Sequence, residues 1–162
     1  MAARFLLLVE GQDDAHVLWN LFEYHQVPET FTVRPTKEDG GIDTLLNNLP
    51  TQLKASDLER LGIVVDANTD LGARWAAVRN ILLQAGGVDI PTAPDPGGTI
   101  VTVERPDRTL RVGVWLMPDN TIRGMLEDFV ACLVPAGDTL WPRVVDCVAQ
   151  IPESERRFSP TH

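Results

Sequence analysis

The sequence predicts a three-layer α/β domain with a mainly parallel central sheet, to which a β-hairpin and C-terminal helices are added. Two continuous apolar runs, residues 4–10 and 61–66, are each followed by a helical pattern, as buried parallel strands are. The order strand, helix, strand, helix also recurs along the first part of the chain, which is typical of a parallel sheet covered by helices. With 162 residues, the chain is long enough for one domain with a full core.

The elements before residue 60 follow from apolar periodicity. After the first strand, a helix is indicated by apolar residues at helical spacing, namely Ala15, Leu18, Leu21 and Phe22. Asp13 or Asp14 is suited to cap its start. A short strand is expected over residues 31–34. A second amphipathic helix follows, kinked or interrupted at Pro50, with the apolar positions Ile42, Leu45, Leu46, Leu49 and Leu53.

The third strand, residues 61–66, leads into a helix from about Leu71 to Ala85, which Gly86-Gly87 stops. Arg74 and Arg79 fall on the outward side of this helix. We expect that side to be a solvated face, with contact to phosphate as the alternative.

The later part of the chain adds a hairpin and two helices. Residues 88–98 are rich in Pro, Gly and Asp and predict an irregular loop, before β-rich runs at 99–104 and 110–116 that predict an antiparallel hairpin. A last helix is expected over 141–151. The helix before it has a stripe that we expect to be buried, formed by Leu126, Phe129, Val130 and Leu133.

We therefore expect a single domain over residues 1–151, with its core at 4–86 and the added hairpin and helices at 99–151. Residues 152–162 form a polar tail. Ser159-Pro160 is a helix-start signal that no helix follows, which indicates a truncated chain.

Composition narrows the function classes. The net charge of −9 argues against a free-standing nucleic-acid binder, because such proteins displace counterions with a basic face. An acidic chain can still act on nucleic acid if a bound metal inverts the local field, or if a partner supplies a basic groove. No apolar stretch approaches the length of a membrane span and no leader is evident, so a cytoplasmic protein is expected. Cys132 and Cys147 lie in apolar helical patterns, which predicts buried free thiols.

Carboxylates follow two of the predicted parallel strands. Glu10 ends the first strand and Asp66 ends the third. In open α/β sheets, chemistry collects at the carboxyl ends of the strands. Carboxylate oxygens are also the ligands that Mg²⁺ and Mn²⁺ prefer. The pair therefore predicts a divalent-metal site, where Asp70 is available for a second ion or a bound water and Gly11 leaves room for close approach.

Other interpretations of the acidic residues stay open. Asp13, Asp14 and Asp70 are suited to be plain helix caps, and Glu10 and Asp66 to be ordinary strand-end residues.

A third acidic group lies after the hairpin and consists of Asp119, Glu127 and Asp128. It is either solvated surface or, if the hairpin returns this segment to the strand ends, the source of a further metal ligand.

These motifs resemble the Toprim domain of topoisomerases, primases and OLD-type nucleases. Its glutamate after the first strand corresponds to Glu10 in Val9-Glu10-Gly11, and its Asp-x-Asp pair after the third strand to Asp66 and Asn68. The resemblance covers about residues 4–86. A second, more distinctive match is to a small uncharacterised bacterial Toprim-like family, through Pro118-Asp119-Asn120 and Gly124-Met125-Leu126-Glu127-Asp128-Phe129.

The resemblance implies divalent-metal-dependent phosphodiester hydrolysis on nucleic acid. Glu10 would be a metal ligand or general base, and Mg²⁺ or Mn²⁺ would be held by Asp66, Asn68 and Asp70. Asn68 stands where the Toprim pattern has aspartate, so it would contribute an oxygen but no charge. By analogy with OLD-type systems, an ATPase or DNA-binding partner is expected. The alternative is a Toprim-fold binding or regulatory module that has lost catalysis, which Asn68 and the acidic charge favour.

Overall fold

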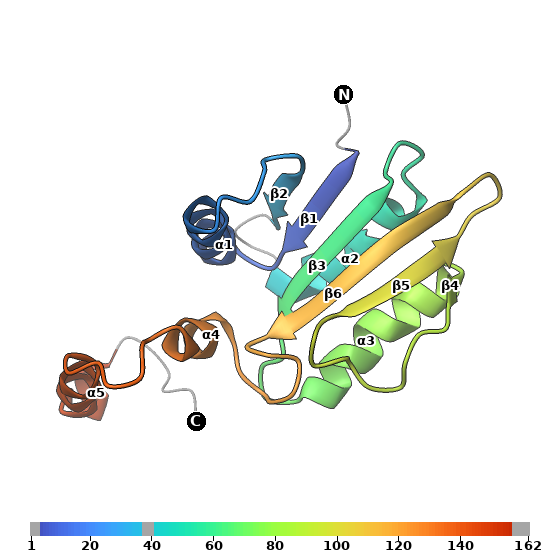
Figure 1. Cartoon of the computed structure of the whole chain (residues 1–162). Helices are drawn as coiled ribbons and strands as arrows, with labels where there is room; N and C mark the ends of the chain where they lie inside the picture. The colour runs from blue at the N-terminus through green and yellow to red at the C-terminus, as the bar shows by residue number, and fades with distance from the viewer. Residues whose placement is uncertain (1–3, 37–40, 157–162) are drawn as a thin grey trace.

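The computed structural model describes residues 4–36 and 41–156 and shows an α/β fold around one six-stranded sheet (Figure 1). The sheet order is β2-β1-β3-β6-β5-β4. The elements in chain order are β1 (Phe5–Val9), α1 (Gln12–Tyr24), β2 (Thr32–Pro35), α2 (Gly41–Lys54), β3 (Arg60–Asp66), α3 (Leu71–Gln84), β4 (Gly87–Val88), β5 (Thr99–Glu104), β6 (Thr109–Met117), α4 (Leu126–Cys132), α5 (Trp141–Ala149) and the 3₁₀ turn η1 (Glu153–Glu155).

The predicted fold class is confirmed, because the sheet is mainly parallel and helices lie on both of its faces. β1 pairs in parallel with β2 and β3, and β3 pairs in parallel with β6. β5 and β6 form the expected antiparallel hairpin. The hairpin is part of the central sheet, since β6 lies directly beside β3. A short strand that the sequence did not predict, β4, pairs with β5 at the edge.

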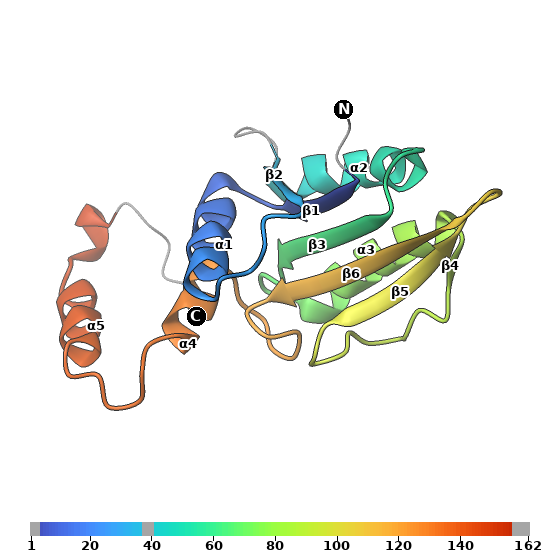
Figure 2. The ribbon, with the colours of Figure 1, turned by 45° about the horizontal axis from the view of Figure 1, so that its top comes forward.

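The two faces of the sheet are covered unequally. Helices α2 and α3 pack along one face, and their buried residues meet the alternate strand residues Leu6, Leu8, Leu61, Ile63, Val65, Val112 and Val114. On the other face α1 and α4 form a smaller core, with Val9, Ala15, Leu18, Val64 and Met117 buried and Leu126 and Phe129 packed against them. Figures 1 and 2 show that α1 and α4 lie at the end where β1, β3 and β6 finish. α1 and α4 therefore cover this face near the strand ends, while Ile100 farther along it is exposed.

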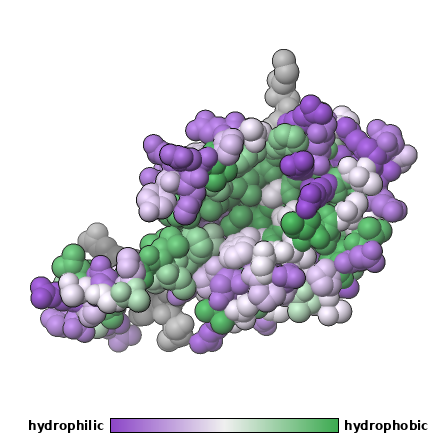
Figure 3. All heavy atoms as spheres, viewed as in Figure 1, coloured by the Kyte–Doolittle hydropathy of each residue, from purple (hydrophilic) through white to green (hydrophobic). Residues whose placement is uncertain are grey.

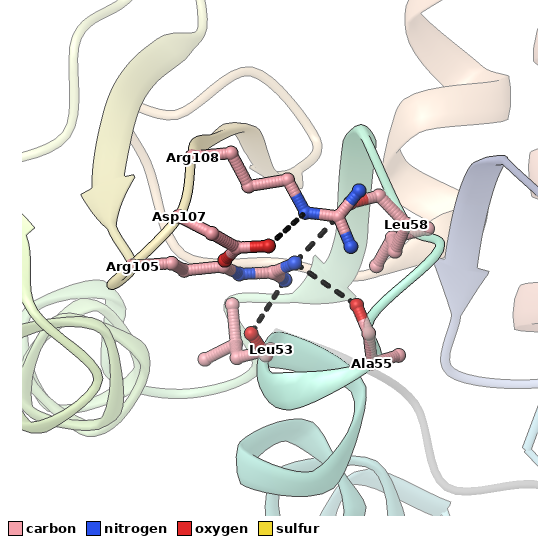
Figure 4. A network of polar contacts seen from close by, with 6 residues as sticks. All are labelled: Leu53, Ala55, Leu58, Arg105, Asp107 and Arg108. Carbon is pink, nitrogen blue, oxygen red and sulfur yellow. Dashed lines mark hydrogen bonds and ion pairs between the residues drawn. The ribbon is translucent and has the colours of Figure 1, made fainter.

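The turn of the hairpin is fixed to the end of α2 by Arg105 (Figure 4). Its guanidinium donates to the carbonyl oxygens of Leu53 at 2.5 Å, Ala55 at 2.9 Å and Leu58 at 3.3 Å. The last carbonyls of a helix have no partner within the helix, so a cation with several N–H donors satisfies them well. Pro50 lies inside α2 without ending it.

Some expectations about the C-terminal helices are wrong. Val130 and Leu133 are 39% and 49% exposed, so only the Leu126–Phe129 side of the α4 stripe packs on the body. Cys132 and Cys147 are free, as expected, but exposed. The physical reason is shared: α4 and α5 extend beyond the sheet and contain no buried residue. The helix-start signal Ser159-Pro160 lies outside the described residues.

Within the described part of the chain, no helix combines the length and apolar character needed to cross a bilayer.

Candidate functional site at the carboxyl ends of β1 and β3

Glu10 and Asp66 lie side by side at the carboxyl edge of the sheet. β1 and β3 are paired in parallel, with Val9 opposite Val64. Glu10 directly follows β1, and Asp66 is the last residue of β3. The backbone N–H of Asp66 donates to Glu10 Oε2 at 3.2 Å. The two residues end their strands as expected, and the sheet order makes those strands neighbours.

The carboxyl of Asp66 is held in an unfavourable environment for its charge. Its Oδ1 is buried and has no hydrogen-bond partner. The pKa of Asp66 is raised to about 7, first by burial and then by the negative charges of Glu10, Asp14 and Glu127, while a backbone hydrogen bond from Leu126 opposes the rise. Near neutral pH this carboxyl therefore exchanges its proton readily, which is typical of functional sites.

Asp14 reaches the same place from the first turn of α1. It is 6% exposed, its Oδ2 accepts the backbone N–H of Gly11 at 2.9 Å, and its Oδ1 is buried without a partner. Burial raises the pKa of this carboxyl as well, and the charges of Asp13 and Glu127 act in the same direction. Gly11 is the N-cap residue and Asp14 the third helical residue, so Asp14 caps α1 from inside the helix.

Arg74 is the cation of the site. It had been expected on a solvated face of α3, but its Nε donates to the carbonyl oxygen of Asp66 at 2.8 Å. Its charge lowers the pKa of Glu10, which burial raises. Arg79 is likewise not free in solvent, because its Nε donates to the carbonyl oxygen of Pro91 at 2.9 Å. Helical periodicity assigns both arginines outward, and only the strand-to-helix turn after β3 brings Arg74 back to the strand end.

Asn68 and Asp70 shape the turn after β3. Asn68 has a φ of 53°, in the left-handed region that asparagine tolerates better than most residues. Its backbone N–H donates to the Gly124 carbonyl at 2.7 Å, and the Gly124 N–H donates back at 2.9 Å. Asp70 is exposed and caps α3, with Oδ1 accepting the Ala73 N–H at 2.9 Å. Of the two interpretations of Asp70, helix cap or metal ligand, the structure shows the helix cap.

Of the third acidic group, Glu127 is the residue whose charge reaches the site. Its charge raises the pKa of both Asp66 and Asp14. Asp119 Oδ1 instead accepts hydrogen bonds from Thr121 and Ile122, which lower its pKa. Asp128 Oδ2 accepts the Met125 N–H at 2.9 Å and so caps α4. The pairing of Gly124 with Asn68 returns this segment to the strand ends, as the sequence allowed but did not require.

Glu10, Asp14, Asp66 and Glu127 are called the acidic cluster below. The chain belongs to the DUF3226 family. The model of this family, described as a protein of unknown function, matches residues 4–162 and thus includes the whole acidic cluster. No curated protein and no solved structure matches the chain. The family's description assigns no activity, so the chemistry has to be argued from the cluster itself.

The acidic cluster fits a hard divalent cation better than any other common group. Two of its carboxylate oxygens, Asp66 Oδ1 and Asp14 Oδ1, are buried and lack hydrogen-bond partners. Oxygen atoms of this kind are the ligands that Mg²⁺ and Mn²⁺ prefer. Over residues 4–36 and 41–156, however, no three His, Cys, Asp or Glu side chains are arranged to hold a metal ion. Mg²⁺ commonly binds through one or two carboxylates and several waters. The residues present therefore fit an ion with few protein ligands, not a closed cage.

Proposed function

We propose that this chain is a Mg²⁺- or Mn²⁺-dependent phosphodiesterase module that acts on nucleic acid, in the manner of Toprim-like nucleases. The observation that carries the proposal is Asp66, a strand-end carboxyl beside Glu10 with a pKa of about 7 and a buried oxygen that lacks a partner. Carboxylates that repel one another in the metal-free protein are stabilised by a divalent cation, which offsets their charge.

The residues divide the chemistry between them. Asp66 would hold the ion, with Glu10 as either a second ligand or the general base and with Asp14 and Glu127 adding negative potential. A bound ion supplies polarisation of a phosphoryl oxygen and lowers the pKa of coordinated water. Glu10 Oε2 accepts the Asp66 N–H, which leaves Oε1 either to bind the ion or to accept a proton from an attacking water. Arg74 places a positive charge beside Glu10, where a phosphate oxygen would need one.

The rest of the chain supports a role with a partner. A net charge of −9 disfavours contact with the phosphate backbone outside the site. We infer that an ATPase or DNA-binding subunit supplies the basic surface, and that the protein works in the cytoplasm, where free thiols such as Cys132 and Cys147 persist.

Cleavage assays test the proposal directly. Labelled single-stranded and double-stranded DNA and RNA are incubated with the protein and Mn²⁺, alongside Glu10→Gln and Asp66→Asn. Both variants are expected to lose at least about a hundredfold in rate, as removal of a metal ligand or general base does. Asp57→Asn is the matched control, because Asp57 is an exposed carboxylate in the segment between α2 and β3. Equal rates for Asp66→Asn and Asp57→Asn would contradict the proposal.

A second candidate is a binding or regulatory module of the same fold without catalysis. The favouring observation is that Asp70 caps α3 and Asn68 carries no charge, so the metal set that the Toprim resemblance implies is depleted. Calorimetric titration with Mn²⁺ separates the two functions. Binding tighter than about millimolar, lost in Asp66→Asn, supports the phosphodiesterase. No binding to the parent protein supports the regulatory module.

A further inference from the structure

One face of the sheet has an apolar surface that no described element covers. It is called the open sheet face and is lined by Leu7, Gly62, Gly98, Ile100, Gly113 and Trp115. Ile100 is 60% exposed although it lies in a six-residue strand. Figure 3 shows the same side as Figure 1, with apolar side chains gathered in a hollow over the sheet. The hollow has a volume of about 260 Å³.

A row of paired residues with two glycines at its centre gives the open sheet face its shape. The strand register places Leu7 opposite Gly62, Gly62 opposite Gly113, and Gly113 opposite Ile100. A Cβ added at Gly113 would meet no atom within 4 Å, so the space above it is empty. At Gly62 that space is already filled, because an added Cβ would meet Leu7 Cδ1 at 2.5 Å. The trough is therefore a hollow above Gly113, between the Leu7 and Ile100 side chains, in a row of four strands that spans about 14 Å at a strand spacing of about 4.8 Å.

Helix α5 carries a complementary surface that also lacks a cover. Its apolar residues fall on one side of the helix and are 40–64% exposed: Leu140, Trp141, Val144, Val145 and Val148. Figures 1 and 2 both place α5 beyond α4, away from the sheet. Helices this short are marginal in water unless their apolar face packs on something. With nine residues α5 is about 14 Å long, which matches the width of the four-strand row that holds the hollow.

We propose that two copies of this chain form a symmetric dimer in which α5 of each copy packs its apolar stripe into the trough of the other. The occupant is a second copy because the chain carries both complementary surfaces, and exchange of identical elements closes the assembly with two-fold symmetry. One short helix buries less than the roughly 1,600 Å² of a standard interface, and the reciprocal exchange doubles that contact.

Charge on the rim of the trough favours the same partner. Arg60 and Arg111 are register neighbours two residues before Gly62 and Gly113, so they lie on the same face beside the trough. Both are exposed. The polar side of α5 and the segment after it carry Asp146, Glu153 and Glu155 against Arg143 and Arg156, a net charge of −1. Two chains of net charge −9 repel each other, and this basic rim is where the carboxylates of Asp146, Glu153 and Glu155 meet opposite charge.

Sedimentation velocity tests the dimer. The parent protein is expected to sediment as a dimer, and Ile100→Lys in the trough and Val145→Lys on α5 to weaken dimerisation at least about tenfold each. Leu83→Lys is the matched control, since Leu83 is 42% exposed on α3, and it should dimerise as the parent does. Circular dichroism verifies that each variant is folded. A parent that stays monomeric at the highest soluble concentration, or an Ile100→Lys variant that dimerises normally, would overturn the proposal.

Cross-linking identifies which chain supplies α5. Two single-cysteine proteins are made in a Cys132→Ser, Cys147→Ser background, one with Ile100→Cys and the other with Val145→Cys and a size tag. A short bismaleimide added to the mixture should give the mixed covalent dimer as the main product. A third protein carries both Ile100→Cys and Val145→Cys. If it cross-links only within one chain, and the mixture of the two single-cysteine proteins gives no mixed dimer, α5 covers the sheet of its own chain and the exchange is overturned.

Discussion

Asp66 shows how a fold changes the chemistry of one side chain. On a flexible chain its carboxyl has the ordinary pKa of 3.8, whereas the end of β3 places it beside Glu10 and away from solvent and raises that pKa to about 7. Asp14 has the same kind of environment, with one oxygen satisfied by Gly11 and the other unsatisfied. Each buried oxygen of the acidic cluster that lacks a hydrogen-bond partner therefore lowers the stability of the metal-free protein.

The pH dependence of stability follows from Asp66. Its folded pKa lies above the unfolded value, so the group favours folding most below pH 3.8 and loses this contribution as pH rises toward 7. Asparagine cannot ionise, so Asp66→Asn avoids the free-energy cost of a buried charge and should be more stable than the parent by about 2 kcal/mol at about pH 8. This is roughly half of what the whole pKa shift implies, because the carboxyl keeps some solvent access. Urea denaturation in EDTA measures this. At about pH 4 the two proteins should differ little.

Asn68→Asp tests whether position 68 contributes to the site. An added ionised oxygen should tighten Mn²⁺ binding about tenfold, because site affinity depends on ligand charge. Repulsion from Asp66 and Glu10 should lower the melting temperature without metal. Aspartate also tolerates the left-handed backbone at this position, so the turn should survive. Calorimetry and thermal melts with and without Mn²⁺ are the measurements. An unchanged metal response would show that the side chain points away from the ion.

At the scale of elements, two connections place the site. The Asn68–Gly124 pairing brings the start of α4 to the strand ends, and Arg105 ties the hairpin turn to α2. Neither contact is local in sequence. Each consists of backbone groups satisfied by a distant segment, so each couples the position of one element to the folding of another.

The α4 connection predicts an electrostatic effect of Glu127. Glu127→Gln keeps the size of the side chain and removes a charge that raises the pKa of Asp66 and Asp14. The pKa of Asp66, followed by NMR of its side chain, should fall, while Mn²⁺ affinity should weaken by about threefold to tenfold since the site loses negative potential. Glu153→Gln is the control, because Glu153 lies in η1 and does not affect these pKa values. Equal Mn²⁺ affinity for the two variants would remove Glu127 from the site.

The Arg105 connection predicts a stability effect. Arg105→Ala leaves the carbonyls of Leu53, Ala55 and Leu58 without their shared donor and should lower the free energy of unfolding by about 2 kcal/mol. Arg108→Ala, in the same turn, loses only a 4.0 Å ion pair with Asp107 and should change stability by less than about 0.5 kcal/mol. Urea denaturation compares them. A similar decrease in the free energy of unfolding in both variants would mean that positive charge in the turn stabilises the fold, and not the hydrogen bonds to the end of α2.

For the whole molecule, metal binding should appear as thermal stabilisation. A ligand that binds only the folded state at about 100 times its Kd adds about 2.7 kcal/mol, or roughly 5–10 °C in melting temperature for a chain of this size. The rise with Mn²⁺ should be larger at about pH 8 than at about pH 5, because Asp66 must be ionised to bind. Differential scanning fluorimetry with Asp66→Asn as the reference provides the check. An equal rise in parent and variant would point to binding elsewhere.

Much of the fold can be predicted from local patterns of apolar residues. The apolar runs before Glu10 and Asp66 predict β1 and β3 to within a residue, and the helical pattern from Leu71 to Ala85 predicts α3. These patterns succeed because a buried strand or helix face must exclude water all along its length. The edge strand β4 and the exposure of Cys132 and Cys147 were missed, since two-residue strands have no period and amphipathic helices do not state what covers them.

The sequence by itself determined the α/β class and the pairing of Glu10 with Asp66, because strand-end carboxylates on two parallel strands follow from apolar runs and chain order. Only the tertiary structure decided the rest of the site. It places the charge of Arg74 beside Glu10 and makes Asp70 the N-cap residue of α3. It also brings Glu127 close enough to raise the pKa of Asp66. The reason is physical: side-chain direction at a turn and the return of a distant segment depend on backbone hydrogen bonds between residues far apart, which no local period records.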